Sequence, residues 1–594
     1  MRKPFSRIFR LCAMLALGTC LFSRLVLAQG GACGQIKSAC VNAGFVQGGL
    51  KSGTGLWKDC IEPILQGKTQ PRKASKGLPQ IDPQIVAACK QQNPSFGNLQ
   101  SRSDQAAQSI PPASTTNAQQ TAPPWTPPKT SSAGPNIVFI LTDDLAMNLL
   151  QFMPHVLEMQ KNGVTFNNYF VTDSLCCPSR SSIFTGRYPH NTGIFRNQGE
   201  DGGYIAFRDR GHEQTTFAIA LSAAGYRTAL MGKYLNGYRP ELHPPGLGWT
   251  AWSVAGNGYP EFHYSLNEDG KVVRYGNEPK DYLTDVLSDK AVRFIKQGGS
   301  QPFMVEIATF TPHAPYVPAP RDLNAFADLR APRTAAYNAA PDANTPNWLL
   351  KHHALTDADM AVIDTAFRKR AQSVLAIDKM IGELQAAVAA IGQEKNTYFV
   401  FSSDNGYHMG EYRLMPGKMT AFDTDIHVPL VITGPGISAG LTENDIVQNI
   451  DLCPTFTELA TASSPPNVDG RSLVPLMRGQ KVSDWRTTTL VEHRGPRHEP
   501  EDPDAPAPRS GNPPSYEAIR SRTEVYVEYV DGEREYHDLV ADPDELHNTF
   551  SSLSKEKKLA LSAVVAAIQN CHGAESCGTA QRQNISSTHA SGQH

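Results

Sequence analysis

The chain has 594 residues, of which 40% are hydrophobic, and its 55 basic and 57 acidic residues leave a formal net charge of −2. This length is too great for one simple hydrophobic core, so we expect two or more domains. A net charge so close to zero excludes an overall basic protein of the kind that binds nucleic acid.

Residues 1–28 have the pattern of a signal peptide. Basic residues come first, residues 11–22 are apolar, and Val26-Leu27-Ala28 forms a suitable cleavage site. The alternatives are an uncleaved anchor, against which Arg24 and the short apolar stretch argue, and a lipoprotein that uses Cys20. No later segment is apolar enough to cross a bilayer. We therefore expect export to a periplasmic, secreted or lysosome-like location, with no transmembrane segment.

Cysteines mark two further regions. In residues 29–98 we expect a small module whose cysteines are Cys33, Cys40, Cys60 and Cys89. In an oxidising compartment these four form disulfides in one of three connectivities. Zinc is the alternative, but the usual C-x2-C spacing is missing. Cys571 and Cys577 predict another bridge in a tail, residues 569–594, that we otherwise expect to be disordered. Residues 99–134, rich in Pro, Gln and Ser, predict an extended linker.

Two apolar runs after the linker each end in oxygen-bearing side chains. Residues 136–142 are followed by two Asp residues, and residues 398–401 lead to an Asp-Asn pair. Such runs are typical of strands buried on both faces of a parallel sheet, whose carboxyl ends bind ligands. An exposed loop or a helix start is the alternative for acids. Two such strand ends together favour a hard cation such as Ca²⁺, which takes roughly six to eight oxygens. The side chains are Asp143, Asp144, Asp404 and Asn405.

The segment 176–187, CCPSRSSIFTGR, lies between these two strands. Neighbouring cysteines seldom form a disulfide with each other, because the bond needs a specific separation and direction. Arg180 offers a planar set of donors that suits an oxyanion. We expect a helix to start at Ser181, with Ser179 as its N-cap, and to direct free N–H groups towards Cys176. The alternative is an inert pair of buried cysteines in a turn.

Three isolated basic side chains follow strands or loops of the same region. Lys233 ends a Met-Gly-Lys sequence, His313 comes shortly after a predicted strand at 303–308, and Lys418 follows the second acidic run. A single Lys or His is usually a surface residue or a satisfied core group, so only the position near strand ends makes these three candidates. An amphipathic helix is expected over residues 357–391. The alternation of strands and helices predicts an α/β fold, a mostly parallel sheet with helices on both faces.

The pattern changes near the C-terminus. Residues 493–514 are charged and rich in proline, and they predict an irregular loop near the mouth of the site. Residues 525–530 and 533–539 alternate as strands around Asp531-Gly532, which predicts a two-residue hairpin turn. We therefore expect a small antiparallel sheet in this part of the chain.

The segment 176–187 fills every fixed position of C-x-P-S-R followed by T-G-R, and it thereby resembles the signature of type I, formylglycine-dependent sulfatases. Four segments are most similar to the N-acetylglucosamine-6-sulfatase branch: Leu175–Arg180, Gly232–Asn236, Leu247–Trp249 and Asp281–Asp285. The resemblance spans about residues 135–550. It implies an alkaline phosphatase-like catalytic domain over residues 135–480, with a mostly parallel sheet sandwiched by helices. A small C-terminal antiparallel sheet subdomain over residues 481–568 is implied as well.

The resemblance also implies roles for the site residues. Cys176 would be converted to formylglycine, an aldehyde whose hydrate attacks sulfur, and a formylglycine-generating enzyme would make it during maturation. The implied catalytic residues are Cys176, Arg180, Lys233, His313 and Lys418, and the implied Ca²⁺ ligands are Asp143, Asp144, Cys176, Asp404 and Asn405. Asp404 is a candidate base and His313 a candidate proton donor. Leu235 departs from the family, which usually has a histidine there.

The activity implied by the resemblance is calcium-dependent hydrolysis of sulfate monoesters, on a sulfated sugar such as N-acetylglucosamine 6-sulfate. A sulfate ester repels anionic nucleophiles, so a metal ion and basic side chains have to neutralise it. One alternative is a hydrolase of phosphonate monoesters or phosphodiesters with the same superfamily core. Another is a non-catalytic secreted binding protein, against which the intact set of metal and anion residues argues.

Overall fold

The computed structural model describes residues 134–497, 502, 504–583 and 585, together with 36, 39–40, 43, 45, 56–67 and 76–92. The chain divides into two compact units, Met1–Pro124 and Trp125–His594. The boundary between them lies within the linker predicted over residues 99–134. The signal peptide predicted over residues 1–28 lies outside the described residues.

The N-terminal unit is a small helical module. Its helices are the π-helix η2 (Leu56–Ile61), α2 (Glu62–Gln66) and α3 (Pro83–Gln92). A disulfide joins Cys40 to Cys60, and Cys89 is also disulfide-bonded. The bridge packs in a small apolar core with Ile36, Phe45 and other buried residues. A module of this size buries little apolar surface, so the predicted disulfide framework contributes much of its stability.

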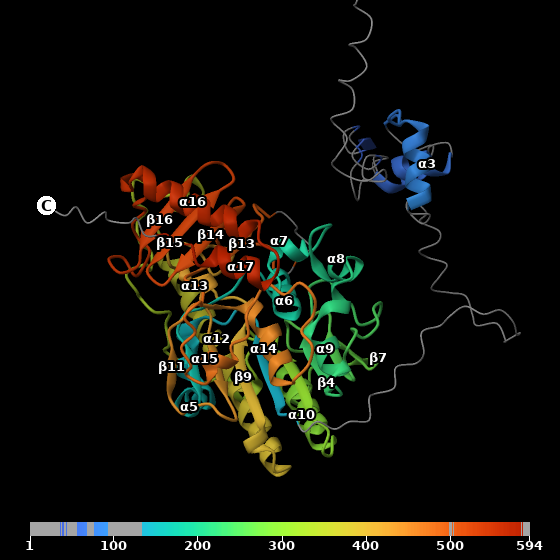
Figure 1. The fold of residues 1–594 in the computed structure, drawn as a ribbon, viewed down its shortest axis with the longest axis vertical. Coiled ribbons are helices and arrows are strands. Elements are labelled where there is room, and N and C mark those ends of the chain that lie inside the picture. Colours follow the sequence, from blue (N-terminus) through green and yellow to red (C-terminus); the bar gives the residue numbers. More distant parts are fainter. Residues whose placement is uncertain are drawn as a thin grey trace, which may run out of the picture. The chain divides into compact units, whose positions relative to one another are not determined.

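The C-terminal unit is built on one large sheet (Figure 1). Among the described residues ten strands follow one another in the order β11-β2-β10-β9-β1-β8-β4-β5-β6-β7. The strands are β1 (Asn136–Thr142), β2 (Val164–Phe166), β4 (Arg227–Lys233), β5 (Ala251–Ala255), β6 (Ser265–Glu268), β7 (Lys271–Arg274), β8 (Phe303–Ala308), β9 (Thr397–Ser403), β10 (Leu430–Thr433) and β11 (Leu441–Glu443). The five central strands β9, β1, β8, β4 and β5 are parallel, whereas β10, β6 and β7 are antiparallel to their neighbours. The mostly parallel sheet that the sequence predicts is therefore confirmed.

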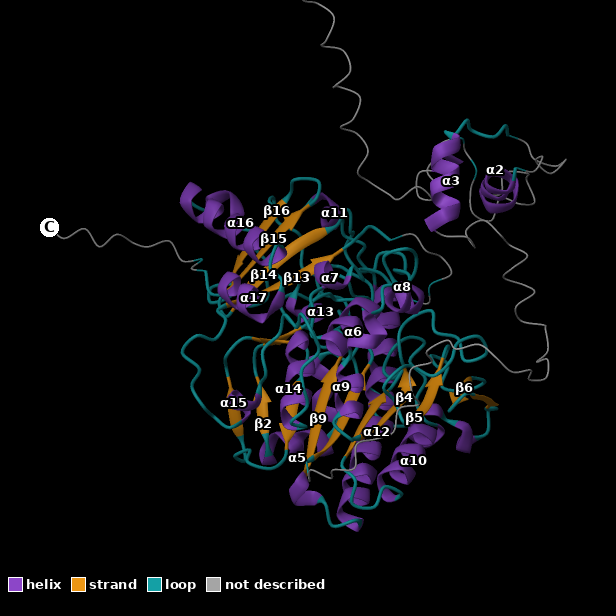
Figure 2. Ribbon diagram, turned by 45° about the vertical axis from the view of Figure 1, so that its right-hand side comes forward, coloured by secondary structure: helices purple, strands orange, loops and turns teal. Residues whose placement is uncertain are grey.

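Alternation along β1 divides the hydrophobic core between the two faces of the sheet. Ile137, Phe139 and Leu141 pack in one cluster, and Val138 and Ile140 in the other. The helices that contribute to the first cluster include α6 (Cys176–Thr185), α9 (Phe217–Ala223) and α14 (Leu452–Leu459). Those that contribute to the second include α5 (Pro154–Asn162), α10 (Leu283–Lys296) and α12 (Asp357–Ala390). Figure 2 shows helices on both sides of the strands, which fits a sheet buried on both faces.

The helix α12 confirms the amphipathic helix predicted over residues 357–391. Its start is fixed by a capping box, in which the Thr356 hydroxyl accepts from the Asp359 N–H and the Asp359 carboxylate accepts from the Thr356 N–H. Shorter elements complete the unit: β3 (Tyr169–Phe170) paired with β12 (Val447–Gln448), α7 (Pro189–Thr192), α8 (Gly203–Asp209), α11 (Asn347–Leu350), α13 (Asp423–Ile426) and α15 (Val474–Met477). No helix in the described part of the chain combines the length and the apolar character that a membrane crossing requires.

A second, antiparallel sheet contains β13 (Thr488–His493), β14 (Tyr516–Ser521), β15 (Glu524–Tyr529) and β16 (Arg534–Asp538). The strands β15 and β16 form the predicted hairpin, but Tyr529 lies opposite Glu533, so the turn has three residues, 530–532, instead of the predicted two. This small sheet lies on the side towards which the parallel strands of the main sheet point (Figure 2). Its β13–β14 connection, the loop predicted over residues 493–514, can therefore reach the carboxyl edge of the main sheet.

The prediction of a disordered tail from residue 569 is wrong for its first part. After α16 (Lys555–Gln569), the chain forms α17 (Gly573–Gln581), and the predicted bridge between Cys571 and Cys577 is present. The Gln581 carbonyl accepts from the Thr487 N–H at 3.2 Å, and its side-chain amide donates to the Tyr188 hydroxyl. These anchoring contacts are tertiary, so the local sequence gives little sign of them.

Candidate active site

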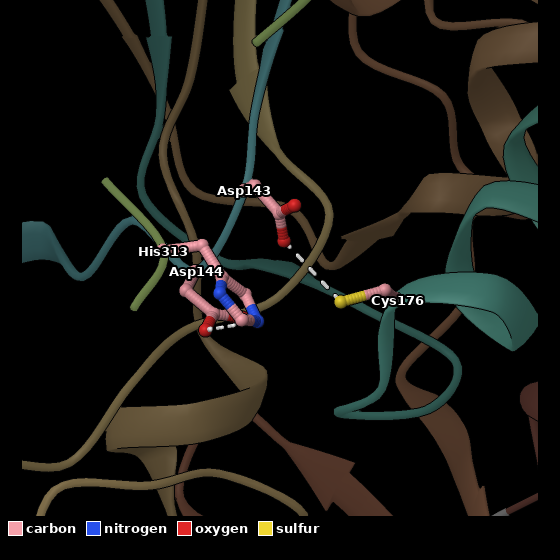
Figure 3. Close-up of side chains that lie close together, drawn as sticks. All are labelled: Asp143, Asp144, Cys176 and His313. Atoms are coloured by element: carbon pink, nitrogen blue, oxygen red, sulfur yellow. Dashed lines mark hydrogen bonds and ion pairs between the residues drawn. The ribbon is translucent and has the colours of Figure 1, made fainter. Parts of the chain in front are cut away.

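The carboxyl ends of four neighbouring parallel strands meet at one edge of the main sheet. Asp143 and Asp144 follow β1, Asp404 follows β9, Lys233 ends β4, and His313 comes shortly after β8. The parallel pairings β9-β1-β8-β4 bring these strand ends side by side. Figure 3 shows Asp143, Asp144 and His313 grouped opposite Cys176. The sequence-predicted residues are thus gathered in one place, and all of them are buried.

The helix α6 presents Cys176 at its N-terminal end, which corrects the predicted start at Ser181. Leu175, in an extended conformation, is the N-cap, and Ser179 lies inside the helix. Pro178 occupies the third helical position, where the backbone N–H would have no intrahelical acceptor, so the proline does not interrupt the helix. The first turn therefore directs its backbone N–H groups and the positive end of the helix dipole towards the side of Cys176.

Two basic side chains hold the acids on one side of Cys176. The Lys233 ammonium lies 2.5 Å from Asp143 Oδ2, and Arg180 Nε donates to Asp404 Oδ2 at 2.8 Å. The Cys176 thiol donates to Asp143 Oδ1 at 3.2 Å. These side chains have almost no exposed surface. Charge-assisted hydrogen bonds of this kind fix the rotamers of the whole group.

Lys418 closes the other side of Cys176. Its Nζ atom lies 2.9 Å from Cys176 Sγ, 2.7 Å from Asp144 Oδ1 and 2.8 Å from Asp504 Oδ1. His313 Nε2 lies 3.5 Å from Asp144 Oδ2 and makes a closer contact with Asp504 Oδ1. Two cationic side chains from different loops therefore converge within reach of the sulfur atom.

The charges of this cluster determine the protonation of its members. Burial and the carboxylates of Asp143, Asp404 and Asp504 raise the pKa of the Cys176 thiol well above its usual value, so the unmodified thiol is a poor nucleophile at neutral pH. Burial alone would lower the pKa of Lys418, but Asp144 and Asp504 outweigh it and raise that pKa.

The pKa of His313 is raised as well. Burial favours the neutral imidazole, but the nearby carboxylates of Asp144, Asp504 and Asp143 favour the imidazolium more strongly. A protonated imidazole is a potential proton donor.

The residues at the strand ends fit a hard cation. One ligand atom from each of Asp143, Asp144, Cys176 and His313 lies within 4.8 Å of the others. Within the described residues no donor forms a hydrogen bond with the buried Asn405 Oδ1, and the buried Asp144 Oδ2 has only a 3.5 Å ion-pair contact with His313 Nε2. Buried oxygens without donors are costly unless something positive satisfies them. The donor set, mostly carboxylate and amide oxygen, suits Ca²⁺ or Mg²⁺ better than a soft metal.

Asp144 has a left-handed backbone with φ of 64°. Aspartate adopts this conformation more readily than most residues, because its short polar side chain can form local hydrogen bonds. The Asp144 N–H donates to Asp404 Oδ1 at 3.2 Å, and the Asn405 N–H donates to the same atom at 2.8 Å. These contacts tie the β1 and β9 ends together and orient the four oxygen-bearing side chains.

Comparison with known proteins identifies the family. The family model described as Sulfatase matches residues 135–462, and the one described as N-sulphoglucosamine sulphohydrolase, C-terminal, matches residues 410–566. The chain is 34% identical over 477 residues to N-acetylglucosamine-6-sulfatase of Capra hircus, which covers 74% of this chain and 84% of that protein. The chain belongs to the sulfatase family.

Solved structures resemble the fold of this sulfatase. A structure described as a complex with its substrate D-glucosamine-2-N,6-O-disulfate has a TM-score of 0.61 at 23% identity, and the match covers 76% of this chain and 99% of that one. Phosphonate monoester hydrolase of Agrobacterium radiobacter has a TM-score of 0.55 at 20% identity, covering 73% of this chain and 96% of that one. At these identities the likeness concerns the fold alone, and it confirms the predicted alkaline phosphatase-like architecture.

A cavity of about 570 Å³ adjoins the buried charged side chains around Cys176 of the sulfatase. Lys233 and Asn236 form part of its lining on the side of Cys176, and aromatic rings contribute elsewhere, among them Tyr259 and Phe310. Aromatic faces combined with amide and charged groups are typical of sites that bind small polar molecules. The volume is large enough for a sugar ring and its substituents.

Leu235 of this sulfatase stands where the resemblance to the family leads one to expect a histidine. Leu235 is buried in the hydrophobic core, and it also belongs to the lining of the cavity, where it offers only an apolar side chain. The next residue, Asn236, lines the cavity, and its amide donates to Asp504 Oδ2 at 2.6 Å. The polar side chain at this turn of the sulfatase is therefore Asn236.

Sequence reasoning missed Asp504, whose carboxylate lies at the centre of the site. It comes from the predicted irregular loop between β13 and β14 and is fully buried. Although burial would raise its pKa, the cations of Lys418, His313 and Lys233 hold that pKa well below the usual range. An acidic residue in a proline-rich loop has no spacing or periodicity that would indicate such a position.

Proposed function

We propose that this sulfatase hydrolyses the 6-sulfate ester of a glucosamine-type sugar such as N-acetylglucosamine 6-sulfate, with a formylglycine at position 176 and a bound Ca²⁺. The observation that carries the proposal is the place of Cys176, buried at a helix start between Lys418 and Asp143 and next to a cavity that can hold a sugar. The substrate class is supported by the relatives named N-acetylglucosamine-6-sulfatase. The exported location is supported by the signal-peptide pattern and by disulfides such as Cys40–Cys60 and Cys571–Cys577.

The metal would be held at the ends of β1 and β9. The proposed ligands are Asp143, Asp144, Asp404, Asn405 and the residue at position 176. The buried Asn405 Oδ1, which accepts no hydrogen bond among the described residues, supports this assignment, as does the buried Asp144 Oδ2 with its 3.5 Å ion-pair contact to His313. A bound cation would polarise the sulfate oxygens and neutralise negative charge on the ester.

The hydrated aldehyde of formylglycine would supply one hydroxyl to attack sulfur and a second to release sulfate afterwards. A formylglycine-generating enzyme is the implied partner during maturation. The raised pKa of the Cys176 thiol is consistent with this need, because the unmodified side chain remains protonated in its acidic surroundings.

The chain's own basic residues perform the electrostatic part of the reaction. Lys418 approaches position 176 from one side, and Lys233 and Arg180 lie beyond Asp143 and Asp404 on the other. In this buried setting they would stabilise the charge that develops on the transferring sulfuryl group, without reorganisation of solvent. They are oriented before substrate arrives, because each is already hydrogen-bonded to a carboxylate.

His313 is the proposed proton donor to the departing alcohol oxygen. Its raised pKa favours the protonated imidazole, and its Nε2 atom faces Asp144 and Asp504 at the centre of the site. The alcohol is a poor leaving group as an anion, so protonation in the transition state accelerates its release. Asp404, held by Arg180, is the candidate base.

The test is a peptide mass spectrum that covers Cys176, recorded on protein from its native host. We expect a peptide that has lost sulfur and gained an aldehyde, together with hydrolysis of aryl sulfate and of N-acetylglucosamine 6-sulfate. Cys176→Ala should abolish turnover, while Cys177→Ala, a neighbouring buried thiol whose side chain packs in the core, serves as the matched control. An unmodified Cys176 in active protein, or faster turnover of aryl phosphate than of aryl sulfate, would contradict the proposal.

A further inference from the structure

The Asp504 carboxylate collects an unusual number of donors. Its Oδ1 atom lies 2.8 Å from Lys418 Nζ and in close contact with His313 Nε2. Its Oδ2 atom accepts from Asn236 at 2.6 Å, Asn197 at 3.0 Å and the Tyr259 hydroxyl at 3.1 Å. These five donors come from separate segments of the main domain, whereas the carboxylate comes from the loop of the small sheet. Such convergence defines an anion-binding position rather than a simple ion pair.

This position is the one that a sulfate ester needs. Asp504 Oδ1 lies 3.6 Å from Cys176 Sγ, and a sulfur atom under attack has to lie about 3–3.5 Å from its nucleophile. A sulfate and the carboxylate therefore cannot occupy the space beside residue 176 together. Lys418 and His313 would bind either of them, since both ligands present negatively charged oxygens.

The exchange of the two anions preserves the charge of the site. A carboxylate and a sulfate monoester each carry one negative charge, so replacing one with the other leaves the balance with the buried cations unchanged. The adjoining cavity shares Asn236 and Tyr259 with the Asp504 contacts. The Asp504 carboxylate would thus lie between a ligand bound in this cavity and residue 176.

We propose that Asp504 is an internal competitor for the sulfate position, which the substrate displaces on binding and which in turn displaces inorganic sulfate after hydrolysis. This inference rests on the proposed function and extends it to the control of sulfate affinity. A carboxylate attached to the same chain competes at every protein concentration, because its binding is intramolecular. If it holds the position in about nine of ten molecules, the apparent affinity for sulfate falls about tenfold.

The first test compares Asp504→Asn with the unaltered enzyme, both carrying metal. Asparagine keeps the shape of the side chain but removes the charge that competes with sulfate. We expect the inhibition constant of inorganic sulfate, measured against aryl sulfate hydrolysis, to fall about tenfold, with KM falling in parallel. Asp209→Asn, which removes an exposed carboxylate from the same domain, is the control and should leave both constants unchanged. An unchanged or higher inhibition constant in Asp504→Asn would overturn the proposal.

A second measurement needs no substitution and so does not depend on the folding of a variant. Crystals of the unaltered protein are soaked with inorganic sulfate, and its dissociation constant is determined by calorimetry. We expect sulfate between Lys418 and His313, with the Asp504 carboxylate moved away from both. Sulfate bound elsewhere, with Asp504 still in contact with Lys418, refutes the exchange. Because this readout is binding, it still decides the role of Asp504 if the protein hydrolyses no sulfate ester and the proposed function fails.

Discussion

Lys418 offers a direct test of the electrostatic role assigned to the basic residues. We consider Lys418→Met, which keeps most of the length of the side chain and removes its charge. In the structure the Lys418 ammonium makes contacts of 2.7 Å, 2.9 Å and 2.8 Å with Asp144, Cys176 and Asp504. It is 4% exposed, so little water can replace the lost charge.

The magnitude follows from the position of this charge beside the reacting group. Removal of one preorganised donor from a buried site lowers kcat about 10²–10³-fold, which corresponds to about 2.7–4 kcal/mol of transition-state stabilisation. Loss of one partner from a buried ion pair also destabilises a protein by about 3–5 kcal/mol. We therefore expect kcat/KM for aryl sulfate to fall at least 100-fold, accompanied by a lower melting temperature.

The assay measures kcat/KM and thermal unfolding on the same preparation, so that loss of activity is not confused with loss of fold. Lys418→Arg, which keeps the charge but changes the geometry, is measured beside it. Lys161→Met on α5 removes an exposed lysine that forms a 3.8 Å surface pair with Glu158, and it serves as the control. A folded Lys418→Met protein with activity within a few-fold of the unaltered enzyme would refute the electrostatic reasoning.

Three further predictions concern the metal, pH and a buried ion pair. Chelation should abolish activity and lower the melting temperature, and added Ca²⁺ should restore both, since a ligand at 100 times its Kd stabilises by about 2.7 kcal/mol. A melting temperature that changes neither with chelator nor with Ca²⁺ would contradict the metal site. Burial, opposed by Arg180, raises the pKa of Glu306 from 4.5 to about 8. Its contribution to stability is therefore complete below about pH 4.5 and is lost as pH rises through about 8. Glu306→Gln should flatten this decline in melting temperature between pH 5 and 8, and parallel plots of melting temperature against pH for the two proteins would contradict the prediction. Asp451→Asn should lower stability to urea by about 3–5 kcal/mol because it leaves buried Arg486 without its carboxylate, whereas Asp484→Asn at the surface should leave the urea midpoint unchanged.

The core elements could be predicted because their sequences carry strong local signals. The run 136–142 is β1 with the same bounds, since the six consecutive apolar or β-branched residues Ile137–Thr142 fit a strand buried on both faces. The helix α12 begins where Thr356 and Asp359 form a capping box. The positions of Asp143, Asp144 and Asp404 followed from topology, because parallel strands end at one edge of a sheet.

Other features depended on contacts between distant parts of the chain. Helix α6 begins at Cys176 rather than at the predicted Ser181, and Pro178 is compatible with its first turn because the missing N–H is not needed there. Helix α17 depends on the Cys571–Cys577 bridge and on Gln581, whose partners are distant in sequence. Asp504 lies in a loop without periodicity, so only the folded structure places it at the site.

Under the proposed function, the complete burial of Cys176 determines whether its conversion to formylglycine comes before or after folding. The thiol has no exposed surface, and it lies beneath Lys418 and the Asp504 loop. A maturation enzyme could not reach it in the folded domain, so under the proposed function the conversion has to precede folding. A chain that folds first would stay inactive even if the enzyme were added later. Production in a host without that enzyme would then yield folded but inactive protein. Unfolding, enzymatic modification of Cys176 and refolding would restore the activity.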